Sequence, residues 1–161
     1  MKTYTNIQIS LGNMVVVANL HSLEGLYFEG QKHEPRIDPI WHHDSTSKLF
    51  SAVSTQLQEY INGTREKFDI PYSFERGTDF QQKVWKALSY IPYGKTMSYQ
   101  ELAKLIEYPK ATRAVAAAIG KNPLSLIIPC HRIIGSNGSL TGYAAGLELK
   151  KRLLTLEKAL Y

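Results

Sequence analysis

The sequence predicts an α/β (α+β) fold in two lobes: a small N-terminal lobe with a short β-sheet and one helix, and a mainly helical C-terminal lobe. Two observations predict this division. Alternating and β-branched apolar residues, which are typical of strands, occur within residues 1–30. From residue 78 onward, apolar residues instead recur at helical spacing behind capping residues. The 161 residues are enough to bury a core without disulfides or metals.

Three short strands are expected near the N-terminus. Ile7 and Ile9 alternate with polar neighbours, as in a half-buried strand. Met14–Ala18 is an apolar, β-branched run that follows a turn at residues 11–13, and Leu26–Phe28 is a third apolar piece. Together these pieces predict the short sheet of the N-terminal lobe.

One helix and two irregular segments complete this lobe. Residues 31–44 contain two prolines and are predicted to form a loop. Apolar residues return at helical spacing from Ser45 to Ile61, and Asn62-Gly63 ends that helix. Residues 64–77 carry no strong pattern, so we interpret them as the linker between the lobes. The stripe that the helix buries is expected to contain Leu49, Ala52, Val53, Leu57 and Tyr60.

Two capping boxes mark helix starts in the C-terminal lobe. Thr78 and Gln81 open the first helix, and Ser98 and Glu101 open the second, which Tyr108-Pro109 breaks. The inward residues are expected to be Phe80, Val84, Trp85, Leu88 and Ile91 in the first helix, and Leu102, Leu105 and Ile106 in the second.

Two more helices are predicted. Lys110–Ile119 is an Ala-rich helix closed by Gly120, and together with the helix before it this makes a helix-turn-helix candidate. Leu147–Leu160 is a last amphipathic helix. Its inner side is expected to contain Leu149, Leu153, Leu156 and Leu160.

Composition and charge limit the classes of function that the chain can have. The chain carries 19 Lys+Arg against 14 Asp+Glu, a net charge of +5, which agrees with a polyanionic partner such as nucleic acid; many ordinary proteins are equally basic. A single cysteine excludes an internal disulfide and a multi-cysteine zinc site. No signal peptide or membrane-length apolar run is present, so we expect a cytoplasmic protein that does not bind membranes. Surface positions are a better interpretation than a metal site for His21, His33, His42 and His43.

The residues best suited to chemistry surround the single cysteine, in the strand-like run Ile127–Ile134. A nucleophilic cysteine needs thiolate character, which the neighbouring His131 or Arg132 can supply to Cys130. Side chains of adjacent residues usually point apart, so a water could bridge Cys130 and His131. The alternative interpretation is that Cys130 is a small buried hydrophobe, as lone cysteines usually are.

The Ala-rich helix is the second signal. Within Ala111–Ala118, Arg113 is the one cation among small side chains that allow close approach to another surface. If that surface is DNA, Arg113 can enter a groove or fill a vacated stack. The alternative is that the alanines are simply good helix formers that pack tightly against a neighbouring helix.

These motifs resemble those of the methylated-DNA–protein-cysteine methyltransferases, also called O6-alkylguanine-DNA alkyltransferases. The resemblance is close over residues 76–161, and the Pro-Cys-His-Arg core is specific in this order and spacing. Residues 1–75 match only in their small α/β character. The resemblance implies a ribonuclease H-like lobe over 1–75 and a DNA-binding alkyltransferase domain over 76–161. The matching segments are Gly77–Gln81, Val84-Trp85, Ile91–Thr96, Ser98-Tyr99, Arg113–Val115, Asn122-Pro123, Ile128–Arg132, Gly142-Tyr143 and Leu153–Glu157.

The resemblance implies a direct-reversal DNA repair reaction that each protein performs once. Cys130 would accept a methyl or alkyl group from O6 of guanine, and also from O4 of thymine, as a stable thioether. His131 would deprotonate Cys130 through a water, and Glu157 would orient His131 as the third member of a triad. Asn122 would support the active-site loop. Tyr99 would help to rotate the nucleotide out and would donate a hydrogen bond to the leaving guanine.

The resemblance also implies the partner, double-stranded DNA that contains alkylated guanine, bound through its minor groove. The damaged nucleotide must be extruded because its alkyl group lies inside the stack, and Arg113 would fill the gap. Tyr143 and Ala144 would wall the pocket, which Ile119 lines. We expect no cofactor, no metal and a monomer, with cooperative binding along DNA left open. The residues expected to contact DNA or substrate are Arg113, Ala114, Ser98, Ile119, Arg132, Tyr143 and Ala144.

The chain departs from the family pattern at two places. Ala116 stands where the family often has glycine, and Ala145-Gly146 stands where a Gly-Gly pair is common. From the second departure we expect a tighter pocket, less suited to bulky groups such as benzyl. Two other functions remain open: a non-catalytic alkyltransferase-like lesion sensor, which the intact Cys130 motif disfavours, and a Cys-His hydrolase with turnover, which the Ala-rich helix-turn-helix disfavours.

Overall fold

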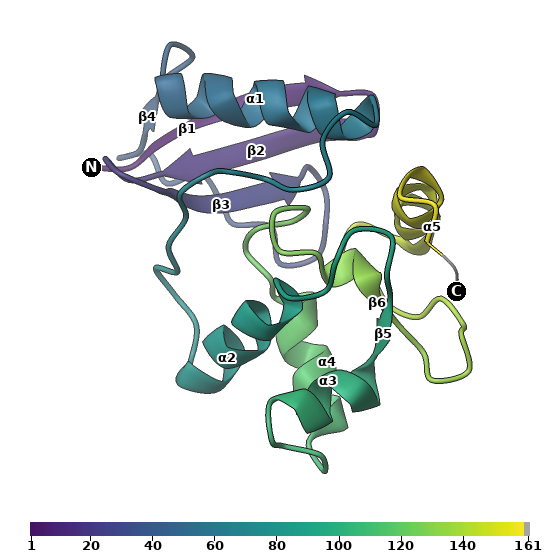
Figure 1. Ribbon diagram of the computed structural model, residues 1–161. Coiled ribbons are helices and arrows are strands. Elements are labelled where there is room, and N and C mark those ends of the chain that lie inside the picture. The colour runs from purple at the N-terminus through teal and green to yellow at the C-terminus, as the bar shows by residue number, and fades with distance from the viewer. Residues whose placement is uncertain (160–161) are drawn as a thin grey trace. The chain divides into compact units, whose positions relative to one another are not determined.

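The computed structural model describes residues 1–159, which form two compact units (Figure 1). The first unit comprises Met1–Glu75 together with Pro123–Ser125. The second comprises Arg76–Asn122 and the chain from Leu126 onward. A sheet with one helix in the first unit and a mainly helical second unit confirm the predicted fold class. Within the described residues, no helix has the length and apolar character needed to cross a membrane.

The first unit is built on a four-stranded sheet with the order β3-β2-β1-β4. β1 (Thr3–Ile9) pairs antiparallel with β2 (Gly12–Ala18), and β2 pairs antiparallel with β3 (Leu23–Phe28). The apolar patterns predict these three strands but not their pairing. The sequence did not predict β4 (His42–His43), which pairs parallel with the start of β1 inside the expected loop. A strand of two residues is too short to show a periodicity.

α1 (Lys48–Ile61) packs against β1 and runs along the sheet (Figure 1). It begins three residues later than Ser45 because Ser47 is the N-cap, whose hydroxyl accepts a hydrogen bond from the Phe50 N–H. It ends as predicted at Ile61, with Asn62 as its C-cap, and Gly63 then takes a positive φ of 78°. The side chains that α1 buries are Phe50, Val53, Leu57 and Tyr60.

The segment interpreted as a linker, residues 64–77, is largely part of the first unit. The Leu23 N–H donates to the Pro71 carbonyl, and the Ser73 N–H donates to the Leu23 carbonyl, so this stretch pairs with the start of β3. Pro123–Ser125 pairs with the same strand through both backbone groups of Leu26. These bridges were not predicted because each consists of a single residue pair between distant parts of the sequence.

The described part of the second unit contains four α-helices, one 3-10 turn and a two-stranded parallel sheet. Both hydrogen bonds of the predicted Thr78–Gln81 capping box are present. α3 and α4 form the expected helix-turn-helix, and the Trp85 indole N–H donates to the Ala118 carbonyl at 2.8 Å, which joins α2 to α4. The elements are α2 (Asp79–Leu88), β5 (Met97–Ser98), α3 (Tyr99–Leu105), α4 (Thr112–Gly120), β6 (Ile133–Ile134) and α5 (Leu147–Leu156).

Three sequence-based expectations for this unit are wrong in detail. Leu105, expected to point inward, is 54% exposed, and Ala103 is buried in its place. α4 begins at Thr112 rather than Lys110. α5 ends at Leu156 because Lys158 adopts a left-handed φ of 56°; Leu160, expected on its inner side, lies outside the described residues.

Candidate active site

Cys130 lies in a tight 3-10 turn, Cys130–Arg132, and not in the strand that its apolar neighbours suggest. The Cys130 N–H donates to the Ile128 carbonyl at 2.8 Å, and the Arg132 N–H donates to the Pro129 carbonyl at 3.0 Å. The strand β6 begins only after this turn. Because the turn is short, it sends consecutive side chains in different directions, yet all three are buried.

Two side chains of this turn converge on one carboxylate. His131 Nε2 lies 2.7 Å from Glu157 Oε2. Arg132 donates to both oxygens of Glu157, through Nε at 2.8 Å and Nη2 at 3.0 Å, and its Nη1 donates to the Ile91 carbonyl at 2.7 Å. Glu157 is the C-cap of α5, so a cluster of side chains more than twenty residues apart ties this helix end to the Cys130 turn.

The charge of Glu157 decides which nitrogen of His131 carries the proton. Burial alone would raise the pKa of Glu157, but the hydrogen bonds from His131 and Arg132 outweigh it and hold the pKa well below its usual range. An ionised carboxylate can only accept, so Nε2 of His131 must be the protonated nitrogen. In the neutral ring, Nδ1 then carries a free lone pair. Nδ1 is buried and makes no hydrogen bond within the described chain.

Burial keeps the resting thiol and imidazole neutral. It raises the pKa of Cys130, against the hydrogen bond from the Asn122 side chain and the positive charge of Lys150. Burial also lowers the pKa of His131, against its hydrogen bond to Glu157. The Asn122 amide additionally donates to the Ile128 carbonyl at 2.9 Å, which braces the segment that leads into the turn. A neutral base and a neutral thiol are the arrangement that a proton transfer between them requires.

The loop after α2 supports Glu157 from its other side. The ring of Tyr93 faces the Arg132 guanidinium at 5.8 Å. Gly94 has a φ of 77°, its N–H approaches Glu157 Oε1 at 3.5 Å, and a Cβ there would lie 3.3 Å from the Glu157 carbonyl oxygen. Glycine is therefore favoured at this position by both its φ and the close approach of backbone.

A second polar cluster centres on the loop between β6 and α5. The Tyr99 hydroxyl donates to the Thr141 carbonyl at 2.9 Å. Lys150 donates to the same carbonyl at 2.9 Å and to the Gly142 carbonyl at 3.1 Å, and its side chain is fully buried. Burial lowers the pKa of Lys150 to about 8, and the facing Cys130 opposes this shift.

Sequence reasoning missed Lys150. The buried stripe of α5 runs through Lys150, Leu153 and Leu154 to Glu157. It shares only Leu153 with the stripe of leucines that was expected. The signal that could have found it is the spacing of Lys150 and Glu157, which places two ionisable residues on the same helical face as two buried leucines.

The other predicted residues lie in different surroundings. Arg113 and Ala114 are exposed on α4, whereas Ile119 is buried at its end. Tyr143 and Ala144 are half-buried in the loop before α5. Two residues expected at the DNA or substrate are buried instead, and their polar groups are used internally. These are Arg132, bound to Glu157, and Ser98, whose hydroxyl caps α3 by accepting from the Glu101 N–H.

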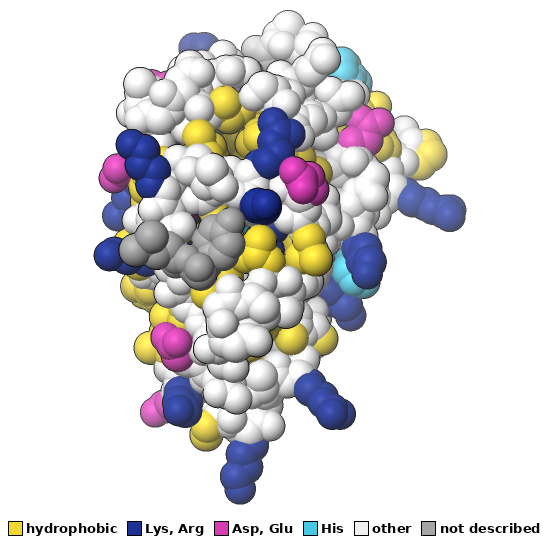
Figure 2. Space-filling view, turned by 90° about the vertical axis from the view of Figure 1, so that its right-hand side faces the viewer, with side chains coloured by type: hydrophobic (Ala, Val, Ile, Leu, Met, Phe, Trp, Pro, Cys, Tyr) yellow, Lys and Arg dark blue, Asp and Glu magenta, His cyan; other side chains and the backbone are white. Residues whose placement is uncertain are grey.

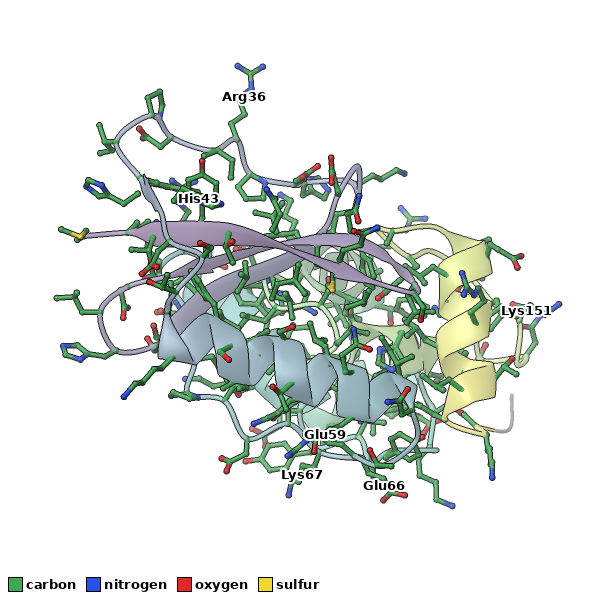
Figure 3. All side chains as sticks on the ribbon, turned by 90° about the horizontal axis from the view of Figure 1, so that it is seen from above. Arg36, His43, Glu59, Glu66, Lys67 and Lys151 are labelled. Atoms are coloured by element: carbon green, nitrogen blue, oxygen red, sulfur yellow. The ribbon has the colours of Figure 1, made fainter. Side chains whose placement is uncertain are left out.

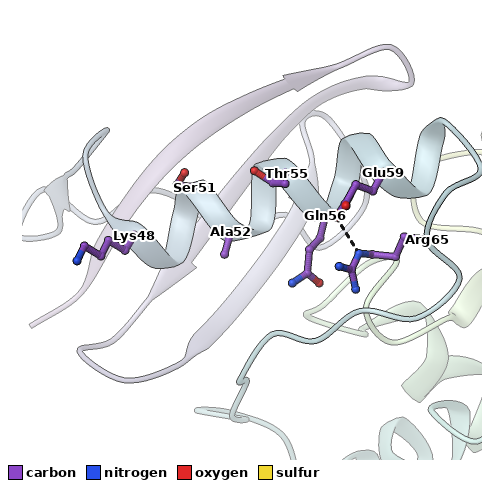
Figure 4. A pocket seen from close by; sticks show the side chains of 7 residues that line it. All are labelled: Lys48, Ser51, Ala52, Thr55, Gln56, Glu59 and Arg65. Atoms are coloured by element: carbon purple, nitrogen blue, oxygen red, sulfur yellow. Dashed lines mark hydrogen bonds and ion pairs between the residues drawn. The ribbon is translucent and has the colours of Figure 1, made fainter.

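A groove with a volume of about 530 Å³ runs along the outer side of α1 in the first unit (Figure 4). Lys48 and Gln56 line it, and the ion pair between Glu59 and Arg65, 3.0 Å long, closes one end. None of the residues predicted to carry the reaction lies there. Among the described residues, no group of three or more His, Cys, Asp or Glu side chains is placed to hold a metal ion.

Comparison with known protein families finds two matches, one in each half of the chain. Residues 2–74 match the model of the ribonuclease-like domain of 6-O-methylguanine DNA methyltransferase, and residues 79–159 match the model of its DNA-binding domain. The chain belongs to the 6-O-methylguanine DNA methyltransferase family. The whole Cys130–Glu157 cluster falls within the second match.

Relatives of similar length are known in this methyltransferase family. The methylated-DNA–protein-cysteine methyltransferase of Methanosarcina barkeri is 44% identical over 96% of both chains. That of Haemophilus influenzae is 43% identical over 98% of this chain and 87% of its own. A crystal structure of Mycobacterium tuberculosis OGT in complex with DNA superposes with a TM-score of 0.88 at 43% identity, over 97% of this chain and 92% of that one.

The Glu157 cluster predicts that acid destabilises the protein. Glu157 and His131 both have folded pKa values below their ordinary 4.5 and 6.5, so the unfolded chain binds more protons as the pH falls. Their contribution to stability is present above those ordinary values and is lost below them. We expect the free energy of unfolding, measured with urea, to fall from pH 6.5 downward and more steeply below 4.5. Glu157→Gln should lower it by about 3–5 kcal/mol at pH 7, because Arg132 is left unpaired.

The matched control is Glu66→Gln, at an exposed glutamate of the first unit (Figure 3). It should reproduce the wild-type stability and its pH dependence. Equal stability of the wild-type protein at pH 7 and pH 4 would contradict the assignment of a buried, ionised Glu157.

Proposed function

We propose that this chain repairs DNA by direct reversal, moving a methyl or alkyl group from O6 of guanine, and from O4 of thymine, to Sγ of Cys130. As a member of its family, the chain is a DNA-repair methyltransferase that acts on O6-alkylguanine. The observation that carries the residue assignment is the His131–Glu157 pair. It leaves a proton-accepting Nδ1 on the residue next to the chain's single cysteine.

The proposed step balances as a displacement at carbon. His131 Nδ1 takes the thiol proton of Cys130 through a water, and Sγ attacks the alkyl carbon as the bond from that carbon to O6 breaks. The electron pair of the broken bond stays on guanine, and the Tyr99 hydroxyl relieves its charge by donating a hydrogen bond. Asn122 and Lys150 stabilise the thiolate while it exists. A thioether is stable, so each molecule reacts once.

DNA binding is assigned to α4 in the minor groove. Arg113 and Ala114 are exposed on this helix, so a cation stands among side chains small enough to permit close approach. The damaged nucleotide must leave the stack before Sγ can reach it, and Arg113 takes its place. Lys and Arg side chains protrude from the surface that Figure 2 draws, and the chain carries 19 of them against 14 Asp and Glu, so cations are available for contacts to phosphates. The M. tuberculosis relative was crystallised in complex with DNA, which supports DNA as the partner.

Ile119, Tyr143 and Ala144 wall the site of the extruded base. The protein acts as a monomer on double-stranded DNA, without a cofactor. It works in the cytoplasm, where reducing conditions keep a free thiol such as Cys130 available.

The test is the mass of the intact protein after incubation with a duplex that carries one O6-methylguanine. We expect a gain of one methyl group that peptide mapping places on Cys130, saturating at one per molecule, and no gain in Cys130→Ser. Tight binding without a mass change would make the protein a lesion sensor. Repeated turnover of an ester without a lasting mass change would make it a hydrolase.

Replacing Arg113 tests the extrusion step separately from the chemistry. Arg113→Ala should slow single-turnover transfer from duplex DNA by about tenfold or more, which corresponds to roughly 1.4 kcal/mol of the extrusion cost. Transfer from the free base O6-benzylguanine, which needs no extrusion, should keep its wild-type rate. Lys67→Ala, at an exposed cation of the first unit, serves as the control and should change neither rate. An equal loss on both substrates would contradict this role.

Ala145 is expected to restrict the size of the alkyl group. Ala145→Gly should raise the rate of benzyl transfer relative to methyl transfer by roughly fivefold, the effect of about 1 kcal/mol of relieved crowding in a pocket. The measurement is the ratio of single-turnover rates on duplexes that carry one adduct or the other. An unchanged ratio would show that this methyl group does not limit the pocket.

A further inference from the structure

Lys150 is a buried cation, and the proposed reaction uses it only as a positive charge near the Cys130 thiolate. Its side chain begins the buried stripe of α5, and lysine is rarely found at a fully buried position. The ammonium group donates to two consecutive carbonyl oxygens, those of Thr141 and Gly142, at 2.9 and 3.1 Å. Both carbonyls belong to the stretch directly before Tyr143 and Ala144. The contact therefore anchors the loop that carries the proposed pocket wall.

The Thr141 carbonyl has a second donor, the hydroxyl of Tyr99 at the first position of α3. A carbonyl oxygen has two lone pairs and can accept from Lys150 and Tyr99 together. The two donors differ in freedom. Lys150 is fully buried and held from inside by α5, whereas Tyr99 is half-buried and meets Thr141 at the protein surface.

The proposed reaction needs the Tyr99 hydroxyl elsewhere. To donate to the leaving guanine, this hydroxyl must give up the Thr141 carbonyl. A carbonyl that loses its only donor destabilises the loop that contains it. With Lys150 in place, Thr141 keeps one charge-assisted hydrogen bond, and such bonds are the stronger kind.

We propose that Lys150 is a positioning residue that anchors the Thr141–Gly142 segment by itself, and so allows the Tyr99 hydroxyl to exchange the Thr141 carbonyl for the guanine without displacing the pocket wall. This inference rests on the proposed function. The charge of Lys150 acts in the same direction, because it faces Cys130 and lowers the pKa of that thiol, while Glu157 neutralises the neighbouring Arg132. Lys150 thus couples the residue that helps the leaving group to the residue that attacks.

The test is a double-mutant cycle in single-turnover methyl transfer from duplex DNA, with Tyr99→Phe, Lys150→Met and the combination. In the wild-type background Tyr99→Phe should slow transfer by about tenfold. In the Lys150→Met background it should slow transfer by roughly twofold or less, because the loop then retains Tyr99. Independent effects, with the same loss in both backgrounds, would overturn the inference.

Two variants separate positioning from general damage. Lys150→Arg keeps the charge and several donors, so it should recover most of the rate that Lys150→Met loses and should restore the dependence on Tyr99. Lys151→Met is the matched control, since the neighbouring lysine points away from α5 into solvent (Figure 3); it should transfer at the wild-type rate. Failure of the arginine variant to restore the dependence on Tyr99 would count against the proposal.

A measurement without any change at Lys150 covers the case in which Lys150→Met does not fold. Amide hydrogen exchange of residues 139–146 should stay within about twofold of wild type in Tyr99→Phe, because Lys150 still holds the Thr141–Gly142 segment. A large rise in exchange would show that Tyr99 is needed to hold the loop, and the inference would fail. This result is independent of repair: if wild-type protein gains no methyl on Cys130, the proposed function fails, whatever the exchange data show.

Discussion

The buried carboxylate of Glu157 is the interaction on which the site depends. A charge in this position is tolerated only when it is paired and hydrogen-bonded, and here the side chains of Arg132 and His131 both bind it. The positive charge of Arg132 neutralises the carboxylate, so the cluster has no net charge while His131 is neutral. A proton on Nδ1 of His131 would add an uncompensated positive charge inside the protein. This explains why the pKa of His131 is lowered by burial even though a carboxylate lies 2.7 Å away.

The Cys130 thiol is also neutral in the resting protein. Cys130 is not kept as a standing thiolate, because burial raises its pKa more than Asn122 and Lys150 lower it. The thiolate nucleophile forms when His131 takes the proton of Cys130, and Asn122 and Lys150 then stabilise the negative charge that develops on sulfur. A protein that can use its cysteine only once benefits from a thiol that stays neutral until a substrate is in place.

The fold could be read from the sequence wherever apolar residues keep a period. The alternation at Ile7 and Ile9 and the Thr78 capping box give the right elements, but β4 is too short to show a pattern. The prediction of the buried face of α5 is wrong. This face holds Lys150 and Glu157, and periodicity rules assign charged residues to the outside of a helix. Cys130 and His131 were identified from the residues themselves, whereas Glu157 was identified only through the resemblance to a family. The bidentate contact of Arg132 to Glu157 could not be, since nothing in the chain order shows that these residues meet.

The measurement that tests this account most directly is the protonation state of the His131 ring, from nitrogen-15 NMR of histidine-labelled protein at pH 7. Comparison with His131→Gln assigns its signals among the five histidines. The account predicts a neutral ring with hydrogen on Nε2, bonded to Glu157, and a bare Nδ1. A ring protonated on Nδ1, as the other tautomer or as the imidazolium, would leave Cys130 without a proton acceptor and would contradict it.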